Sequence, residues 1–220
     1  MKTAPRQGIV PPQVARHLPT GEVDSRDEYV SLALSDVSFE NHVGDSLIFE
    51  LVRLRRVSFV RSSVKRLRFT DARLDSCDLT AVSWEQAHLR RVEIAGCRMW
   101  GANLFKAHIE DARFDECNAE NAVLAGAVLK AVRFENCKLA NISLAEADLS
   151  SVVFRRCDLS GADLRGAQLI GADLRNCIID GLRVNAADLK GAIIEPAQAA
   201  DIARLLGIIV KNTEESTNEG

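Results

Sequence analysis

Residues 161–174 read GADLRGAQLIGADL, in which a five-residue unit with a central leucine recurs. The same period extends in both directions along the chain. From Leu34 to Ile194, steps of five give thirty-three positions, and all but two of them hold Leu, Ile, Val, Phe, Met or Trp. The residue two places before each is Ala, Cys or Val at twenty-six of the thirty-three positions. Repetition at a fixed period indicates one structural unit stacked many times.

A second period of twenty residues is marked by the cysteines. All six follow it, at Cys77, Cys97, Cys117, Cys137, Cys157 and Cys177. A period of five fits neither the roughly 3.6 residues of a helical turn nor the alternation of a flat strand. It fits a chain that turns a corner every five residues, so that four sides close a square coil of twenty. Coils stacked at the parallel-strand spacing of about 4.8 Å would place like residues in columns.

Glycines, prolines and charges support the same coil independently. Eight of the nine glycines within the repeats share one phase, which we interpret as the corner, where glycine is conformationally cheap. No proline occurs between Pro19 and Pro196, as expected if every amide is needed for pairing between coils. Between residues 30 and 194, charged residues twenty apart are opposite in sign in fourteen pairs and alike in four. Stacked opposite charges attract, so this bias predicts direct stacking.

The unit resembles the repeat of the pentapeptide-repeat family, written A-(D/N)-L-x-x with the leucine central. Matching triplets begin at Ala102, Ala147, Ala162, Ala172 and Ala187. The resemblance covers residues 30 to 194. It implies an all-β fold, a right-handed quadrilateral parallel β-helix with 20 residues per coil.

Four parts of the chain follow from the extent of the repeat. Residues 1–29 hold four of the five prolines and are expected to be partly disordered or to cap the first coil. Residues 30–194 form the solenoid. Residues 195–210 are predicted to form a C-terminal cap, and the polar residues 211–220 a disordered tail.

The predicted cap is a short helix that begins near Pro196 and stops at Gly207, followed by a last strand. The spacing of Gln198, Ala199, Ala203 and Gly207 resembles the C-terminal cap of a mycobacterial fluoroquinolone-resistance member of the family. That member dimerises through this end, so the resemblance implies a homodimer here. The candidate interface residues are Ile202, Leu205, Leu206, Ile208, Ile209 and Val210.

Compartment is suggested by what the sequence does not contain. The first 27 residues have no apolar run of signal-peptide length, and no stretch approaches the roughly 20 apolar residues of a membrane span. The cysteines all take the small inward position, which favours reduced core residues over disulfides. A straight ladder does not converge four thiolates on one zinc ion. We expect a cytoplasmic protein.

Signs of catalysis are scarce. The sequence has no phosphate loop, zinc-ligand spacing or nucleophile elbow, and a square coil filled with Ala and Leu predicts flat outer faces without a pocket. We therefore expect no enzymatic activity and no cofactor. His88 and His108, twenty residues apart and outward, should stack about 5 Å apart. With Glu110 they form a conceivable surface metal site; the alternative is a solvated pair.

Partners are suggested by the family and by charge. Some members bind DNA gyrase or topoisomerase IV, with an acidic β-helix that imitates duplex DNA. Here residues 30–194 contain twenty-two Lys/Arg and twenty-two Asp/Glu, which weakens that interpretation. Plasmid-borne quinolone-resistance members also carry loops that interrupt the repeat, whereas this repeat is unbroken. One acidic cluster remains as a partner-binding candidate: Glu110, Asp111, Asp115, Glu116 and Glu120.

The opposite extreme is residues 51–70, with seven basic residues and no acid. Several of these charges should pair with neighbouring coils, as in Asp36/Arg56, but Arg61, Arg66 and Arg68 lack an acid twenty residues away. They are either a site for an acidic partner or solvated surface. No outward aromatic residues accompany them, so direct nucleic-acid binding is not expected.

Bulky residues complete the candidates. Trp100 and Phe105 fall at outward positions on consecutive sides of one coil, either as a partner-binding patch or as scattered surface residues. Trp84 takes an inward position, where its bulk should strain or bulge the coil. His42 and Gly44 break both inward positions of one unit, so residues 41–45 are predicted to be an irregular loop.

The sequence thus predicts a non-enzymatic protein-interaction module. The best specific candidate for its partner is a type II topoisomerase, either DNA gyrase or topoisomerase IV. The alternative is an assembly or regulatory scaffold with an unrelated protein partner.

Overall fold

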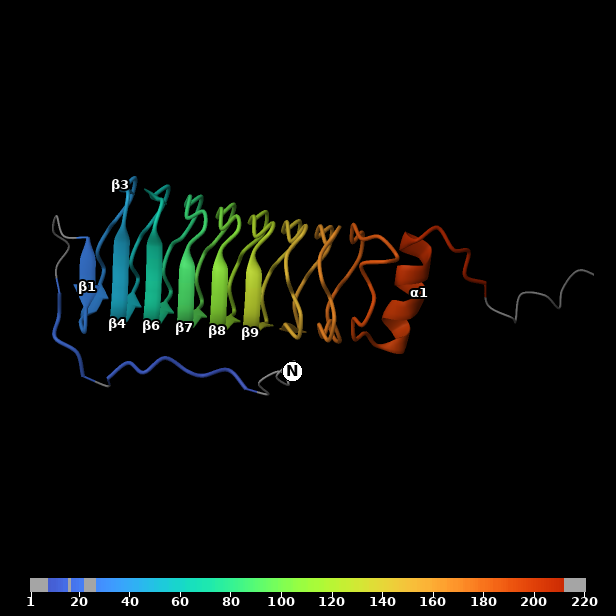
Figure 1. Cartoon of the computed structure of the whole chain (residues 1–220), viewed down its shortest axis with the longest axis horizontal. Helices are drawn as coiled ribbons and strands as arrows, with labels where there is room; N and C mark the ends of the chain where they lie inside the picture. The colour runs from blue at the N-terminus through green and yellow to red at the C-terminus, as the bar shows by residue number, and fades with distance from the viewer. Residues whose placement is uncertain (1–7, 16, 22–26, 212–220) are drawn as a thin grey trace, which may run out of the picture.

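The computed structural model describes residues 8–15, 17–21 and 27–211, and it confirms the predicted fold class. The chain winds into a parallel β-solenoid with about 20 residues per coil. Figure 1 shows the coils stacked along one axis, from β1 at one end to α1 (Pro196–Leu205) at the other. The tail predicted at 211–220 lies outside the described residues except for Lys211.

Parallel pairing at an offset of twenty residues builds the main sheet, in the order β1-β4-β6-β7-β8-β9-β10, with β2 also paired to β4. Beyond the named strands, single backbone pairings keep the same offset from Ser38 and Ser58 as far as Asp173 and Ile193. The strands are β1 (Glu28–Val30), β2 (Ala33–Ser35), β3 (Val43–Gly44), β4 (Leu47–Arg55), β5 (Ser63–Val64), β6 (Leu67–Asp75), β7 (His88–Ala95), β8 (His108–Asp115), β9 (Val128–Glu135) and β10 (Val153–Arg155).

Corners of the coils adopt the left-handed backbone conformation, as the glycine phase predicts. Gly161 and Gly171 have φ of 67° and 75°, and Ala131 adopts a φ of 52° at the same phase. An L-residue in this conformation costs roughly 1 kcal/mol, so stacking of the neighbouring coils must hold it in place.

The core consists of columns of like residues, as the period predicts. Phe114, Phe134 and Phe154 stack with ring centroids 4.7 and 5.2 Å apart. The six cysteines are free and buried in one inward column. The Cys137 thiol donates to the carbonyl oxygen of Phe114 at 3.5 Å, and Cys157 makes the equivalent contact with Phe134 at 3.5 Å. The cysteines therefore behave as small core residues whose weak donors are satisfied.

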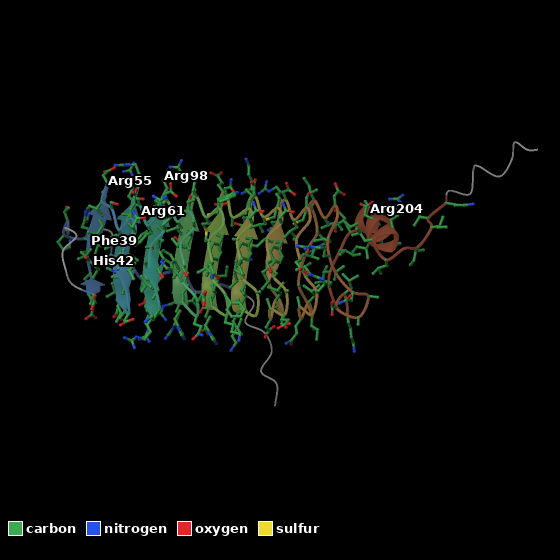
Figure 2. The ribbon with its side chains drawn as sticks, turned by 90° about the horizontal axis from the view of Figure 1, so that it is seen from above. Phe39, His42, Arg55, Arg61, Arg98 and Arg204 are labelled. Atoms are coloured by element: carbon green, nitrogen blue, oxygen red, sulfur yellow. The ribbon has the colours of Figure 1, made fainter. Side chains whose placement is uncertain are left out.

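The irregular loop predicted at residues 41–45 is not found. Strand β3 pairs in register with β5, twenty residues later. His42 fills the interior beside Phe39, with the two rings nearly perpendicular and their centroids 6.4 Å apart (Figure 2). A Cβ atom at Gly44 would lie 2.9 Å from the His42 Nε2. The absent side chain of Gly44 thus leaves room for the imidazole, and the coil stays regular.

Trp84 does not bulge the coil either. Its neighbour Ser83 pairs in register with Ser63 and Asn103 on either side. The indole is 2 % exposed, and its N–H donates to the buried Ser62 hydroxyl at 3.0 Å. The small Ser62 makes space for the ring and also supplies its hydrogen-bond acceptor.

Helix α1 caps the last coil, within one residue of the predicted start. The Gln198 side-chain amide donates to the carbonyl oxygens of Leu174 and Cys177 at 2.8 Å each, and its oxygen accepts the Glu195 N–H at 3.0 Å. The last strand predicted at residues 208–210 is wrong: these residues form no strand and are exposed. Gln198 already satisfies two carbonyl groups at that end, and Gly207, with a φ of 80°, ends the helix.

The cysteine column makes a first prediction. All six thiols are buried, so a thiol reagent reaches them only when the coils open. The native protein should therefore react slowly with a thiol reagent and rapidly in urea. Cys137→Arg should prevent stable folding, since it places an unpaired charge in a thin core. Labelling kinetics and urea denaturation measure both effects.

Cys137→Ala is the matched control, because alanine is common at the small inward position. It should fold with a loss of about 1 kcal/mol in the free energy of unfolding, as expected for a small core truncation. Rapid labelling of all the thiols in native protein would contradict the packed column.

Candidate protein-interaction surfaces

The N-terminal residues 8–15 lie along the outside of the solenoid. Figure 1 shows this blue segment beside the stack. It runs from the middle coils toward β1, opposite to the order in which the coils follow one another. The Val10 N–H donates to Asp111 Oδ1 at 3.1 Å, and the Gln13 N–H donates to Asp71 Oδ1 at 2.9 Å. Further along, Arg53 Nη2 donates to the Ala15 carbonyl oxygen at 3.4 Å. We call residues 8–15 the strap.

Three corner residues beneath the strap form an alternating charge column. Asp71, Arg91 and Asp111 lie twenty residues apart, and both aspartates are buried, at most 5 % exposed as whole residues. Arg91 makes a bidentate hydrogen bond with Asp71. The hydrogen bond from Arg91, and less strongly that from the Gln13 N–H, hold the pKa of Asp71 below its ordinary 3.8, although burial opposes them. We call these three residues the Asp71 column.

A groove of about 290 Å³ lies on the outer side of strands β6 to β9. The prediction of uniformly flat outer faces is therefore wrong. Side chains projecting from the sheet on both sides of the 69/89/109 column make the groove walls. Its lining includes Arg68, Thr70, His88, Arg90, His108, Glu110, Val128 and Lys130.

The two histidines stack in this groove as predicted, with ring centroids 5.1 Å apart and planes 5° apart. Glu110 lines the same groove, in register between Arg90 and Lys130. Within the described part of the chain, no group of three metal-ligating side chains gathers here or elsewhere.

The acidic cluster of the sequence does not form one acidic surface. Asp111 is buried under the strap, and Glu110 faces the groove between two cations. Asp115 accepts hydrogen bonds from Arg113 at 2.9 Å and from Asn136 at 3.0 Å. Glu116 and Glu120 follow on the next sides of the coil, with Glu116 exposed and Glu120 half-buried. Neighbours in sequence are thus distributed around the coil.

Charges in the basic run are partly paired. Arg56 contacts Asp36 at 2.5 Å, as predicted, and Lys65 contacts Asp45 at 2.7 Å. Arg61 has a partner that the charge pattern could not show: its Nε donates to Asn41 Oδ1 at 3.1 Å. Figure 2 shows Arg55, Arg61 and Arg98 on the outside of the coils. Arg66 and Arg68 are also exposed.

Apolar side chains are exposed at two of the predicted places. Trp100 is 51 % exposed, while Phe105 is half-buried with the Lys106 ammonium 5.0 Å from its ring centroid. At the C-terminal end, Ile202 packs on the core. The rest of the predicted dimer interface is exposed, namely Leu205, Leu206, Ile208, Ile209 and Val210.

The repeat sequence that forms the coils matches models of known protein families. A family model described as "Pentapeptide repeat region" matches residues 67–144, and one described as "Pentapeptide repeats (8 copies)" matches segments that span residues 127–195. The chain belongs to the pentapeptide-repeat family. No curated protein sequence is significantly similar to it.

Comparison with solved structures finds other pentapeptide-repeat proteins at low sequence identity. HetL, a pentapeptide repeat protein involved in heterocyst differentiation regulation from the cyanobacterium Nostoc sp. PCC 7120, is 20 % identical. The match covers 76 % of this chain and 86 % of HetL, with a TM-score of 0.39. A pentapeptide repeat protein of the Arabidopsis thaliana thylakoid lumen is 18 % identical over 57 % of this chain and 81 % of its own, with a TM-score of 0.37.

The full-length plasmid-mediated fluoroquinolone resistance protein QnrB1 is 16 % identical. The match covers 82 % of this chain and 100 % of QnrB1, with a TM-score of 0.35. In the described residues of this pentapeptide-repeat protein, no helix has the length and apolar content needed to cross a membrane.

The Asp71 column makes a second prediction. Replacing Arg91 with methionine should raise the pKa of Asp71, because the main interaction that lowers it is removed while burial and the more distant Arg90 remain. The folded-state pKa of Asp71 is depressed, so its stabilisation is present above about pH 4 and is lost as the pH falls through the lowered value. Urea denaturation should therefore show the destabilisation by Arg91→Met at neutral pH, diminishing below pH 4.

Arg56→Met is the matched control, since Arg56 also pairs with an aspartate twenty residues earlier. That pair is exposed, with side chains 47 % and 58 % exposed, so its loss should cost less. Equal effects of the two substitutions, or an effect of Arg91→Met that does not vary with pH, would contradict the role of the Asp71 column.

Proposed function

We propose that this pentapeptide-repeat protein is a non-enzymatic protein-interaction module. The observation that supports this most is the apolar C-terminal end, where five large hydrophobic side chains between Leu205 and Val210 are at least 36 % exposed. Contiguous exposed apolar surface is a mark of protein–protein contact. The free, buried cysteines favour a reducing compartment, for which we propose the cytoplasm.

A homodimer through the C-terminal end is the first contact that we propose. The interface would consist of Leu205, Leu206 and the exposed segment 208–210, with Ile202 supporting it from the core side. A two-fold contact at this end would join two solenoids into a rod of roughly double length.

A type II topoisomerase is the specific partner that we propose to test first, because the family resemblance suggests it. The other proposed contact surfaces on the coils are the exposed acids Glu110 and Glu116 with Glu120, the patch of Trp100 and Phe105, and the basic residues Arg61, Arg66 and Arg68. Asp111 and Asp115 are weaker contact candidates, since both accept internal hydrogen bonds.

An assembly or regulatory scaffold for another protein is the second candidate function. It is favoured by the distribution of charge, because acids and bases alternate along columns such as Arg90, Glu110 and Lys130. A DNA mimic needs a continuous run of negative charge, since duplex DNA carries one negative charge per about 1.7 Å.

Dimerisation gives a third prediction. Sedimentation should show a dimer at micromolar concentration, and Ile209→Asp should shift it to a monomer because a charge would enter an apolar interface. Ile209 is 82 % exposed, so the substitution should leave the solenoid folded. Ile170→Asp is the matched control, as Ile170 is 61 % exposed on the coils, and it should remain dimeric. A wild-type monomer at this concentration would remove the proposed interface.

Topoisomerase binding gives a fourth prediction. The protein at micromolar concentration should inhibit supercoiling by DNA gyrase or shield gyrase from a quinolone. The effect should weaken steeply with salt, because contacts between exposed charges are screened over about 8–10 Å. Charge reversal of Glu110, Glu116 and Glu120 to lysine should abolish it.

The control for that prediction is a second triple reversal, of Glu40, Glu146 and Asp180 to lysine. These acids are exposed elsewhere on the coils, and the change in net charge is the same. Loss of activity in both variants would indicate a non-specific charge effect. A wild-type protein that neither inhibits nor shields gyrase would exclude this partner and leave the scaffold function.

A further inference from the structure

The strap and the Asp71 column have matching spacings. The two N–H groups that bind the column belong to Val10 and Gln13, three residues apart. Their acceptors, Asp111 and Asp71, are two coils apart, or about 9.6 Å at the parallel-strand spacing. A polyproline II chain rises about 3.1 Å per residue, hence about 9.3 Å over three residues. One turn of such a chain therefore spans two coils.

The residues between the two donors suit this geometry. Pro11 and Pro12 lack an N–H, so no donor between Val10 and Gln13 is left without an acceptor. Proline also fixes φ near the value of polyproline II, which lowers the entropy lost on binding. Pro12 is buried, while Gln13 is exposed. At the Asp71 column, the strap thus contributes two backbone donors separated by two prolines.

The column is built to accept two backbone donors. Asp71 and Asp111 are at most 5 % exposed, and Arg91 lies between them in the same corner column. Arg91 holds Asp71 with two of its hydrogen bonds, so this carboxylate is ionised and fixed in orientation. Hydrogen bonds to a charged acceptor are stronger than those between neutral groups.

We propose that the Asp71 column is a docking site for an extended protein segment of the type X-Pro-Pro-X, and that the strap occupies it as a built-in competitor. The segment binds through the N–H groups of the residues at both ends of the Pro-Pro pair. This site is distinct from the proposed topoisomerase and dimer surfaces and does not depend on either. A partner carrying such a segment has to displace the strap, which is tethered and so has a high local concentration.

The test uses the full chain with the strap disabled and a peptide in trans. The variant Val10→Pro/Gln13→Pro keeps the strap extended but removes both donors. A fluorescent peptide GIVPPQVA, the sequence of residues 8–15, should bind this variant at least tenfold more tightly than it binds the wild-type chain, in which the site is occupied. Fluorescence anisotropy measures the affinity. Absence of binding to the variant would overturn the proposal.

A second peptide tests the donors without any further change in the protein. Methylation of the backbone nitrogens that correspond to Val10 and Gln13 should weaken binding to the strap-disabled variant at least tenfold, since two hydrogen bonds to carboxylates are lost. Equal binding of methylated and unmethylated peptides would show that contacts other than these backbone donors hold the segment, and would overturn the proposal.

Variants of the column locate the site. Asp71→Ala and Asp111→Ala, each in the strap-disabled chain, should weaken peptide binding. Alanine is tolerated at this corner, because Ala131 adopts the same left-handed conformation in the next coil of the same column. Asp36→Ala is the matched control: Asp36 has the same corner phase and also pairs with an arginine twenty residues later, but on another side of the coil. Its variant should bind the peptide normally.

Amide hydrogen exchange in the wild-type chain separates the two contacts. Asp111→Ala should accelerate exchange at Val10, Asp71→Ala should accelerate it at Gln13, and Asp36→Ala should affect neither. Circular dichroism verifies that each variant is folded. Peptide binding that is unchanged by both column substitutions would overturn the proposed site, even if the peptide binds elsewhere.

Discussion

Main-chain pairing at a constant offset of twenty residues is the constraint on which the rest of the structure depends. Each coil pairs with the next at this offset, for example Arg98 with Asn118 and Asn118 with Lys138. Because of this offset, each residue lies above the residue twenty positions earlier. Side chains at equivalent positions of successive coils therefore share one environment. Left-handed corners make the offset possible and are costly for residues such as Ala131 and Asp111. The stacked core must offset that cost at every coil, which explains the uniform filling of the interior.

Much of the fold could be predicted from the sequence because this constraint repeats. The period, the cysteine column and the glycine corners are each visible as a residue type recurring at one phase. Two of the local errors, at residues 41–45 and at Trp84, concern residues that depart from their phase. Gly44 leaves space for His42, and Ser62 gives both space and an acceptor to Trp84. In both cases a second residue compensates for the unusual one. A prediction that considers each position separately misses this compensation and expects an irregular coil.

The candidate surfaces were less predictable, because adjacency along the chain differs from adjacency on the solenoid. The acids from Glu110 to Glu120 lie within ten residues of one another in sequence but on different sides of the coil. One lines the groove, one is buried in the Asp71 column, and others face solvent. The strap was missed for a related reason. Its acceptors lie forty residues apart in the repeats, while its donors lie before the repeats, and only the Val-Pro-Pro-Gln sequence hinted at an extended segment. The stacked pair of His88 and His108 was predictable, since both residues belong to one column.

A solenoid of this kind presents its partners with outward groups at a regular spacing. Outward groups of one phase recur at about 4.8 Å along the axis, so an extended ligand must match multiples of that distance. A β-strand, rising about 3.3 Å per residue, returns the same side every second residue, at about 6.6 Å, and loses register. One turn of polyproline II, at about 9.3 Å, coincides with two coils. The even spacing of charged residues along a column therefore favours ligands in the polyproline II conformation, whatever their side chains. In the Asp71 column, Asp71 and Asp111 are the two residues whose spacing matches the strap.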